Sequence, residues 1–273
     1  MFFIAFLIIA IACSVISIKT LVGYSDMHIS KKILISTIIA LGWVAPLLVT
    51  FLGHTNFLPT KVFALISFGC YTLFGFVFIV FCLLMLRDII WYAIYGSARL
   101  AGIDSWSLNP KNISVLGHAN LIVLLLGALL SVYAIYQGVK IPDVNYITVE
   151  HQFLNKNLRI VQLTDTHIDR TTPLSRVRKI VEKVNSLNPD IIVLTGDIFD
   201  DDATVLNDHL AIMANLSAPY GIYASMGNHE FYNGFYSWLY QYEKLGFKVL
   251  VNHGETVAGD IFIAGVPDAY AAC

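Results

Sequence analysis

Charge is scarce in this sequence and unevenly spread. Only 13% of the 273 residues are Asp, Glu, Lys or Arg. Residues 1–140 hold 8 Lys and Arg against 3 Asp and Glu, whereas residues 141–273 hold 9 against 16. The net charge of −2 therefore combines an apolar, slightly basic first half with an acidic second half. This asymmetry predicts two unlike domains, and the acidic half gives no indication of nucleic-acid binding.

Cysteine is almost missing from the acidic half. Three of the four cysteines lie in long apolar runs of the first half, and the fourth, Cys273, is the last residue. The second half therefore has no internal disulfide pair. An exported domain can do without one, so cysteine usage does not fix the compartment.

Long apolar runs dominate the first half, at residues 1–18, 33–53, 62–86 and 119–139. Each is close to the ~20 residues that a membrane-spanning helix needs. The first run could instead be a signal peptide, but it lacks a basic leading segment and a cleavage site. The pattern predicts a membrane domain over residues 1–140 with four transmembrane helices.

Basic residues between the runs predict the orientation of these helices. Six lie between the first and second runs or between the third and fourth, namely Lys19, Lys31, Lys32, Arg87, Arg99 and Lys111. The loop between the second and third runs carries only Lys61. Since basic loops stay in the cytoplasm, we expect the second half on the outer, periplasmic face of a bacterial cytoplasmic membrane.

The second half alternates strand-like and helix-like segments. The expected strands are Tyr146–Glu150, Leu158–Leu163, Asp190–Thr195, Gly221–Met226, Phe247–Val251 and Ile261–Val266. The expected helices are Leu174–Leu187, Leu206–Leu216 and Phe235–Leu245. This order predicts an α/β layered domain over residues 146–273, with parallel strands in its first part.

Three polar strings each follow one of the expected strands. They supply Asp165 and His167, then Gly196, Asp197 and Asp200, then Gly227, Asn228, His229 and Glu230. Taken singly, each string is an ordinary turn or loop. Taken in order, they bring oxygen and nitrogen ligands to the carboxyl ends of neighbouring strands, where open α/β sheets build their sites. The combination predicts a site for two divalent metal ions.

These strings are the patterns D-x-H, G-D-x-x-D and G-N-H-[DE], which resemble the first three signatures of the calcineurin-like metallophosphoesterases. The segments around Leu158–His167, Asn188–Asp197, Ala218–Tyr223 and Ala264–Asp268 are similar to the bacterial membrane-associated branch of that family. The resemblance covers residues 146–270 and implies an αββα sandwich. It also implies a metal-dependent phosphoesterase or phosphodiesterase.

The resemblance assigns roles by matched position. It implies that Asp165, His167, Asp197 and Asn228 bind two metal ions (Mn, Fe or Zn), with Asp197 as the bridge. A metal-bound hydroxide would attack the phosphoester, and His229 would protonate the leaving oxygen as general acid, held by Asp200. Glu230 is expected to support its loop rather than to bind metal.

The family's later ligands, a single His and a Gly-His-x-His, have no counterpart in this sequence. These ligands cannot be replaced by His151, His209 or His253, because none of the three lies at a matching position. His253 is expected in a turn. We therefore expect a carboxy-terminally truncated chain with an incomplete sandwich and negligible hydrolysis of a bis-aryl phosphodiester with Mn²⁺. The alternative function is a catalytically inactive membrane fragment or scaffold.

The expected partners are the membrane and a phosphoester substrate. Membrane anchoring favours a lipid-linked substrate, and family members that cleave a UDP-diacylglucosamine-type pyrophosphate offer an analogy. Asp201 and Asp202 are expected at a solvated helix start.

Overall fold

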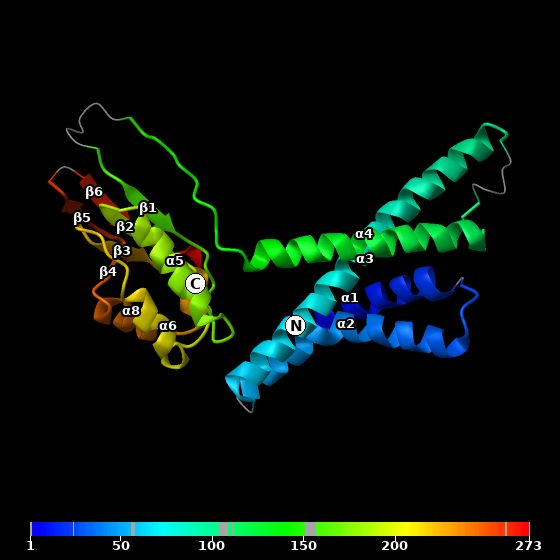
Figure 1. Cartoon of the computed structure of the whole chain (residues 1–273), viewed down its shortest axis with the longest axis horizontal. Coiled ribbons are helices and arrows are strands. Elements are labelled where there is room, and N and C mark those ends of the chain that lie inside the picture. Colours follow the sequence, from blue (N-terminus) through cyan, green and yellow to red (C-terminus); the bar gives the residue numbers. More distant parts are fainter. Residues whose placement is uncertain are drawn as a thin grey trace. The chain divides into compact units, whose positions relative to one another are not determined.

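The computed structural model describes residues 2–23, 25–55, 58–103, 109–110, 112–150, 157–259 and 261–272. His151 and Cys273 lie outside these residues. The chain divides into two compact units, Met1–Lys140 and Ile141–Cys273. Each unit is described by itself below (Figure 1).

Four long apolar helices form the first unit. They are α1 (Phe2–Ile18), which a π-helical turn continues over Lys19–Gly23, α2 (Ile29–Thr55), α3 (Thr60–Leu100) and α4 (Ile113–Val139). Each is long and apolar enough to cross a membrane. The expectation of four apolar helices ahead of an α/β domain is confirmed.

The third helix is much longer than its apolar run. We expected a loop from residue 87, but α3 has 41 residues and continues to Leu100. Arg87 and Asp88, which form an ion pair of 2.5 Å, end the apolar stretch without ending the helix, because charge limits the apolar run and not the helical backbone. The chain turns only after Ala101, where Gly102 adopts a left-handed φ of +74°.

Glycine allows the helices of this unit to approach closely. A Cβ atom on Gly42 in α2 would lie 2.9 Å from Val77 of α3, and one on Gly127 in α4 would lie 2.7 Å from Val80. Small residues at such contacts are typical of membrane helices, which associate by close packing. The buried Trp43 adds edge-to-face contacts with aromatic rings of α3.

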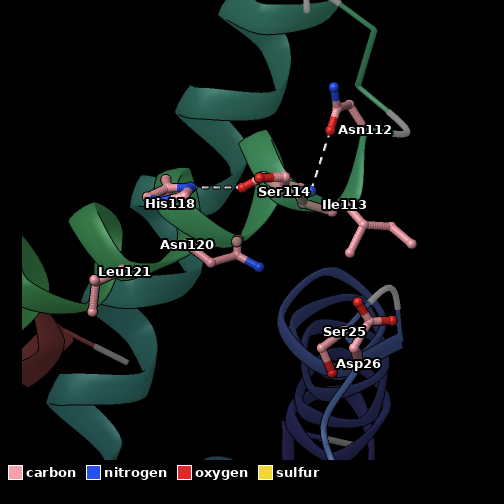
Figure 2. Close-up of a pocket in the computed structure, with 10 residues that line it drawn as sticks. Ser25, Asp26, Asn112, Ile113, Ser114, His118, Asn120 and Leu121 are labelled. Carbon is pink, nitrogen blue, oxygen red and sulfur yellow. Dashed lines mark hydrogen bonds between the residues drawn. The ribbon is translucent and has the colours of Figure 1, made fainter.

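A cavity of about 880 Å³ opens where the first turns of α4 face the end of the α1–α2 connection. Figure 2 shows Ser25 and Asp26 across from Asn112, whose side chain accepts from the N–H of Ser114 and so caps α4. Nearby, the Asn120 side chain donates to the Thr20 carbonyl at 3.2 Å and accepts from Arg87. These bonds tie α4 to both α1 and α3.

A four-stranded parallel sheet organises the second unit, in the order β1-β2-β3-β4. Its strands are β1 (Ile160–Leu163), β2 (Ile191–Thr195), β3 (Ile222–Ser225) and β4 (Lys248–Val249). The connections contain α5 (Leu174–Ser186), α6 (Asn207–Met213) and α8 (Phe235–Lys244). Shorter helical turns are Ala203–Val205, α7 (Asn228–Tyr232) and η4 (Ala269–Ala272). The antiparallel strands β5 (His253–Val257) and β6 (Ile261–Gly265) make a second sheet.

Alternating side chains of the parallel sheet enter two separate cores. Ile192 and Leu194 of β2 pack with the buried faces of the helices. Ile191, pointing to the other face, packs with Val257 of β5. The parallel sheet therefore lies between a helical layer and the β5–β6 sheet, in agreement with the expected α/β layering.

Several local expectations were wrong. Residues Tyr146–Glu150 form no strand, and the side chains of Tyr146 and Ile147 are 82% and 85% exposed. An alternating pattern gives a strand only where a neighbouring strand accepts its hydrogen bonds. His253 lies in strand β5 rather than in a turn, paired opposite Gly265. His209 lies in α6, as expected.

The acidic run after Phe199 is less solvated than expected. Asp202 caps the Ala203–Val205 turn, but Asp201 is half-buried and forms an ion pair of 2.5 Å with Arg170. Burial alone would raise the pKa of Asp201, yet the hydrogen bond and charge of Arg170 lower it overall. The Asp201 carbonyl also accepts from the Trp238 indole, which anchors α8.

Trp238 is fully buried and its ring stacks on Phe199 with centroids 4.4 Å apart. We predict that Trp238→Ala lowers the free energy of unfolding by about 3–5 kcal/mol, because it leaves a large cavity and an unpaired Asp201 carbonyl. The measurement is denaturant unfolding of the detergent-solubilised chain, followed by near-UV circular dichroism. Tyr236→Ala, at an 83% exposed position, serves as control and should change stability by less than about 0.5 kcal/mol.

Candidate metal centre

The loops that follow β1, β2 and β3 meet at one edge of the parallel sheet. The first two continue to hydrogen-bond beyond the strands, since the N–H of Asp165 donates to the Gly196 carbonyl and that of His167 to the Asp197 carbonyl, at 3.2 and 3.0 Å. This continued pairing fixes the register of the first two polar strings. It places the side chains of the two strings next to each other at the carboxyl ends of β1 and β2.

Three polar residues of these loops have an unusual backbone. Asp165, His167 and Asp197 adopt φ values of +52°, +44° and +54°. Non-glycine residues in this left-handed region are uncommon and cost on the order of 1–3 kcal/mol each. Such strain typically gathers at functional sites, where the surrounding structure holds it.

Possible ligand atoms converge from all three loops. Atoms of His167, Asp197 and His229 all lie within 4.8 Å of one another, and the two imidazole rings meet edge-to-face with centroids 4.6 Å apart. The backbone N–H of His229 donates to Asp197 Oδ1 at 3.0 Å. One oxygen of Asp197 is thereby fixed by the third loop.

The other two expected ligands line an adjoining cavity. Asp165, Asp197 and Asn228 share a hollow of about 270 Å³ with Asp268, which follows β6. Among the described residues, Asp197 therefore belongs both to the cavity lining and to the cluster with His167 and His229. Asn228 and Asp165 lie on the cavity side, and the two histidines lie in the ligand cluster.

Asp200 lies beside both histidines. Its Oδ1 is 2.6 Å from Nδ1 of His229, and its Oδ2 is 3.7 Å from Nδ1 of His167. Partial burial lowers the pKa of His229, but the hydrogen bond and the charge of Asp200, followed by the charges of Asp197 and Glu230, raise that pKa overall. The imidazole of His229 is therefore biased towards its protonated form, and its Nε2 is left for other chemistry.

Glu230 is fully buried, and its carboxylate holds two of the loops together. It accepts from the backbone N–H groups of Asp197, Ile198 and Phe199 at 2.8–3.2 Å, and from that of Gly227 at 2.9 Å. The Tyr242 hydroxyl donates a fifth bond at 3.2 Å. Burial and the charge of Glu230 hold the pKa of Tyr242 well above its ordinary value, so its phenol stays a donor. Glu230 supports the loops, as expected from sequence.

Two glycines permit the close approach of these loops. A Cβ atom on Gly227 would lie 2.1 Å from Oδ1 of Asp197, and one on Gly196 would lie 2.8 Å from the Gly227 backbone. Gly196 also has φ +88°. In the structure the missing side chain of Gly196 admits the backbone of the third loop.

Sequence reasoning missed Asp268 as a site residue. The backbone N–H of Asp268 donates to the Met226 carbonyl at 3.0 Å, which draws the chain after β6 to the end of β3. The motif around Ala264–Asp268 was noticed only as part of the family resemblance. No local signal indicates that the Asp268 side chain reaches the cavity.

The donor set fits divalent metal ions. Carboxylate oxygens, an amide oxygen and imidazole nitrogens suit Mn, Fe or Zn. His167, Asp197 and His229 offer ligand atoms within 4.8 Å of one another, and Asp165 and Asn228 line the adjoining cavity. The residues in place to hold such ions are Asp165, His167, Asp197 and Asn228, with His229 within reach.

We predict that Glu230→Gln destabilises the second unit by about 3 kcal/mol, because the new amide would point N–H groups at backbone N–H donors. Thermal and denaturant unfolding of the full chain in detergent would measure the change. Tyr242→Phe is the matched variant and should cost about 1 kcal/mol, since it removes a single hydrogen bond. Equal losses in the two variants would contradict the central role of the carboxylate.

Comparison with known proteins agrees with this geometry. Residues 158–266 match the family model of the calcineurin-like phosphoesterases. The chain is 35% identical over 144 residues to an uncharacterized metallophosphoesterase of Campylobacter jejuni, which covers 51% of this chain and 38% of that protein. It is 30% identical over 190 residues to a transmembrane protein with metallophosphoesterase domain of Bos taurus, covering 66% and 42%.

A third relative has a named activity. The UDP-2,3-diacylglucosamine pyrophosphatase LpxG of Chlamydia muridarum is 40% identical over 75 residues, which cover 27% of this chain and 23% of LpxG. The chain thus spans less than half the length of each of these three relatives. No solved structure matches it. Following four long apolar helices, the second unit of this chain is a calcineurin-like metallophosphoesterase domain.

Proposed function

We propose that this chain carries metal ligands and the acid of a membrane-anchored phosphoesterase that depends on two divalent metal ions. The observation that carries the proposal is the meeting of Asp165, His167, Asp197, Asn228 and His229 at one edge of the sheet, with Asp200 bonded to His229. The reaction class is hydrolysis of a phosphodiester or phosphomonoester.

The chain's residues divide into ligands and an acid. Asp165 and His167 would hold one ion, Asn228 the other, and Asp197 would bridge them. When bound, the ions supply an activated water and positive charge for the phosphoryl oxygens. Mn, Fe or Zn would suit this mixed oxygen and nitrogen set.

His229 would act as the general acid. Asp200 accepts the Nδ1 proton, which orients the ring and favours its charged form. Nε2 could then protonate the leaving oxygen of the ester. His229 also lies in the cluster with His167 and Asp197, so the metal affinity of a His229 variant distinguishes an acid from a ligand.

A lipid-linked phosphoester is the substrate class that we propose. Four apolar helices hold the chain at a membrane, and the similar LpxG acts, by its name, on a diacylglucosamine pyrophosphate. A UDP-diacylglucosamine-type pyrophosphate is therefore one candidate.

The positions of the basic residues support a proposal for the side of the membrane on which the second unit lies. Lys19, Lys31 and Lys32 surround the turn between α1 and α2, and Arg87 and Arg99 lie in the part of α3 beyond its apolar run. We propose that these positions face the cytoplasm of a bacterial cell and that the second unit lies in the periplasm.

We predict that the detergent-solubilised chain binds two Mn²⁺ ions, counted by titration with electron paramagnetic resonance. Asp197→Asn should weaken both sites by at least about 10-fold, because it removes the bridging charge. His229→Gln should leave Mn²⁺ affinity within about threefold, since an acid is not a ligand. Any Mn²⁺-dependent phosphodiester hydrolysis should be lost in both variants.

Lys179→Gln, on the exposed face of α5, serves as control and should change neither property. Failure of the unsubstituted chain to bind Mn²⁺ would contradict the proposed function. Loss of a bound ion in His229→Gln would instead make His229 a ligand and leave the acid unassigned.

We also predict that alkaline phosphatase fused after Glu150 is active in a bacterial host, because that enzyme folds only after export to the periplasm. A fusion after Met27 should be inactive, since the α1–α2 turn is expected on the cytoplasmic side. A green fluorescent protein fusion gives the reciprocal readout. Activity of the phosphatase at Met27 and not at Glu150 would reverse the proposed topology.

A further inference from the structure

Two exposed tyrosines stand beside the candidate general acid. Tyr232 ends α7 and Tyr270 lies in η4, and the two side chains are 57% and 48% exposed. The Tyr232 ring contacts the His229 ring, with centroids 5.6 Å apart, and the Tyr270 ring edge-to-face, with centroids 4.7 Å apart. The three rings thus form a continuous row that starts at the metal centre.

The segment that carries Tyr270 also forms a wall of the metal cavity. Val266, Pro267 and Asp268 line that cavity together with Asp165 and Asn228. The N–H of Tyr270 donates to Asp268 Oδ1 at 2.8 Å, so the position of the tyrosine depends on the cavity wall. The tyrosine pair therefore stands next to a wall of the cavity in which the proposed function places the phosphate.

The rings have the arrangement that a flat ligand needs. Tyr232 and Tyr270 meet at 74°, so a planar group could stack on one ring while its edge meets the other. Aromatic side chains such as tyrosine stack on nucleobases, and this stacking depends little on which base is bound. Half of each side chain is open to solvent, which leaves part of each ring accessible to a ligand.

We propose that Tyr232 and Tyr270 form a subsite for a planar ring carried by the phosphoester, of the nucleobase or aryl class. The inference rests on the proposed function, because it places the phosphate at the metal centre. Because Tyr232 contacts His229, the proposed general acid, the bound planar ring would lie on the side of the leaving group. Tyr232 and Tyr270 are specificity residues in this proposal and take no part in proton transfer.

The test compares two ligands that differ only in the ring. Adenosine 5′-monophosphate and ribose 5-phosphate carry the same pentose phosphate, and isothermal titration of the full chain in detergent with Mn²⁺ gives both affinities. We expect the nucleotide to bind about 10-fold more tightly or better. In Tyr232→Leu and Tyr270→Leu the preference should fall to about threefold or less, while ribose 5-phosphate affinity stays within about twofold.

Two variants control for loss of structure. Tyr232→Phe keeps the ring and should keep the preference, and Tyr240→Leu removes a 62% exposed tyrosine of α8 and should have no effect. Circular dichroism confirms the fold of each variant. Equal affinity of the two ligands for the unsubstituted chain would overturn the ring subsite and leave the proposed function intact.

Failure of both phosphates to bind the Mn²⁺-loaded chain would count against the proposed function. Adenosine, which has no phosphate, then decides the subsite by saturation-transfer nuclear magnetic resonance. Transfer to the base protons that disappears in Tyr232→Leu would support the subsite. Absence of transfer to adenosine in the unsubstituted chain would overturn it.

Discussion

The geometry of the candidate metal centre depends on the hydrogen bonds of the Glu230 carboxylate. Four backbone N–H groups and one phenol donate to it in a fully buried position. Three of the N–H groups belong to consecutive residues after Gly196, and their convergence on one carboxylate bends the chain there. The left-handed φ of Asp197 is part of this bend. A buried charge is costly unless it is fully hydrogen-bonded, and here the loops provide the bonds that it needs.

The same carboxylate couples the site to the helical layer. Tyr242 reaches Glu230 from α8, and Trp238, one turn earlier in α8, donates to the Asp201 carbonyl. Asp201 in turn pairs with Arg170 after β1. The loops after β1, β2 and β3 are therefore all held in place by α8 and the residues that it contacts. This support offsets the strain of the left-handed ligand residues.

The architecture of the site could be predicted from local patterns. Apolar runs ending in Asp165, Asp197 and Asn228 indicate parallel strands whose carboxyl ends are adjacent, and the structure places them so. The four apolar helices were equally evident. These predictions succeeded because strand and span signals lie within a few consecutive residues and the polar strings follow them directly.

Other features of the structure could not be predicted from local patterns. Asp268 reaches the cavity because its N–H finds the Met226 carbonyl, a pairing that no local pattern encodes. Tyr146–Glu150 has the alternation of a strand, yet no described strand pairs with it. The length of α3 was not predicted because the apolar run ends at Arg87, whereas the helical backbone continues through charged and polar residues to Leu100.

Asp197 shows why the loops must meet so closely. Its Oδ1 accepts from the His229 N–H, which leaves Oδ2 and the remaining lone pair of Oδ1 for ions. That contact requires the third loop to pass where any side chain at Gly227 would collide with Asp197. The carboxylate that we propose as the bridge is thus oriented by the backbone of the residue whose side chain we propose as the acid. Movement of this loop would therefore also move the Asp197 carboxylate, so the proposed metal binding and the proposed proton donation share one structural element.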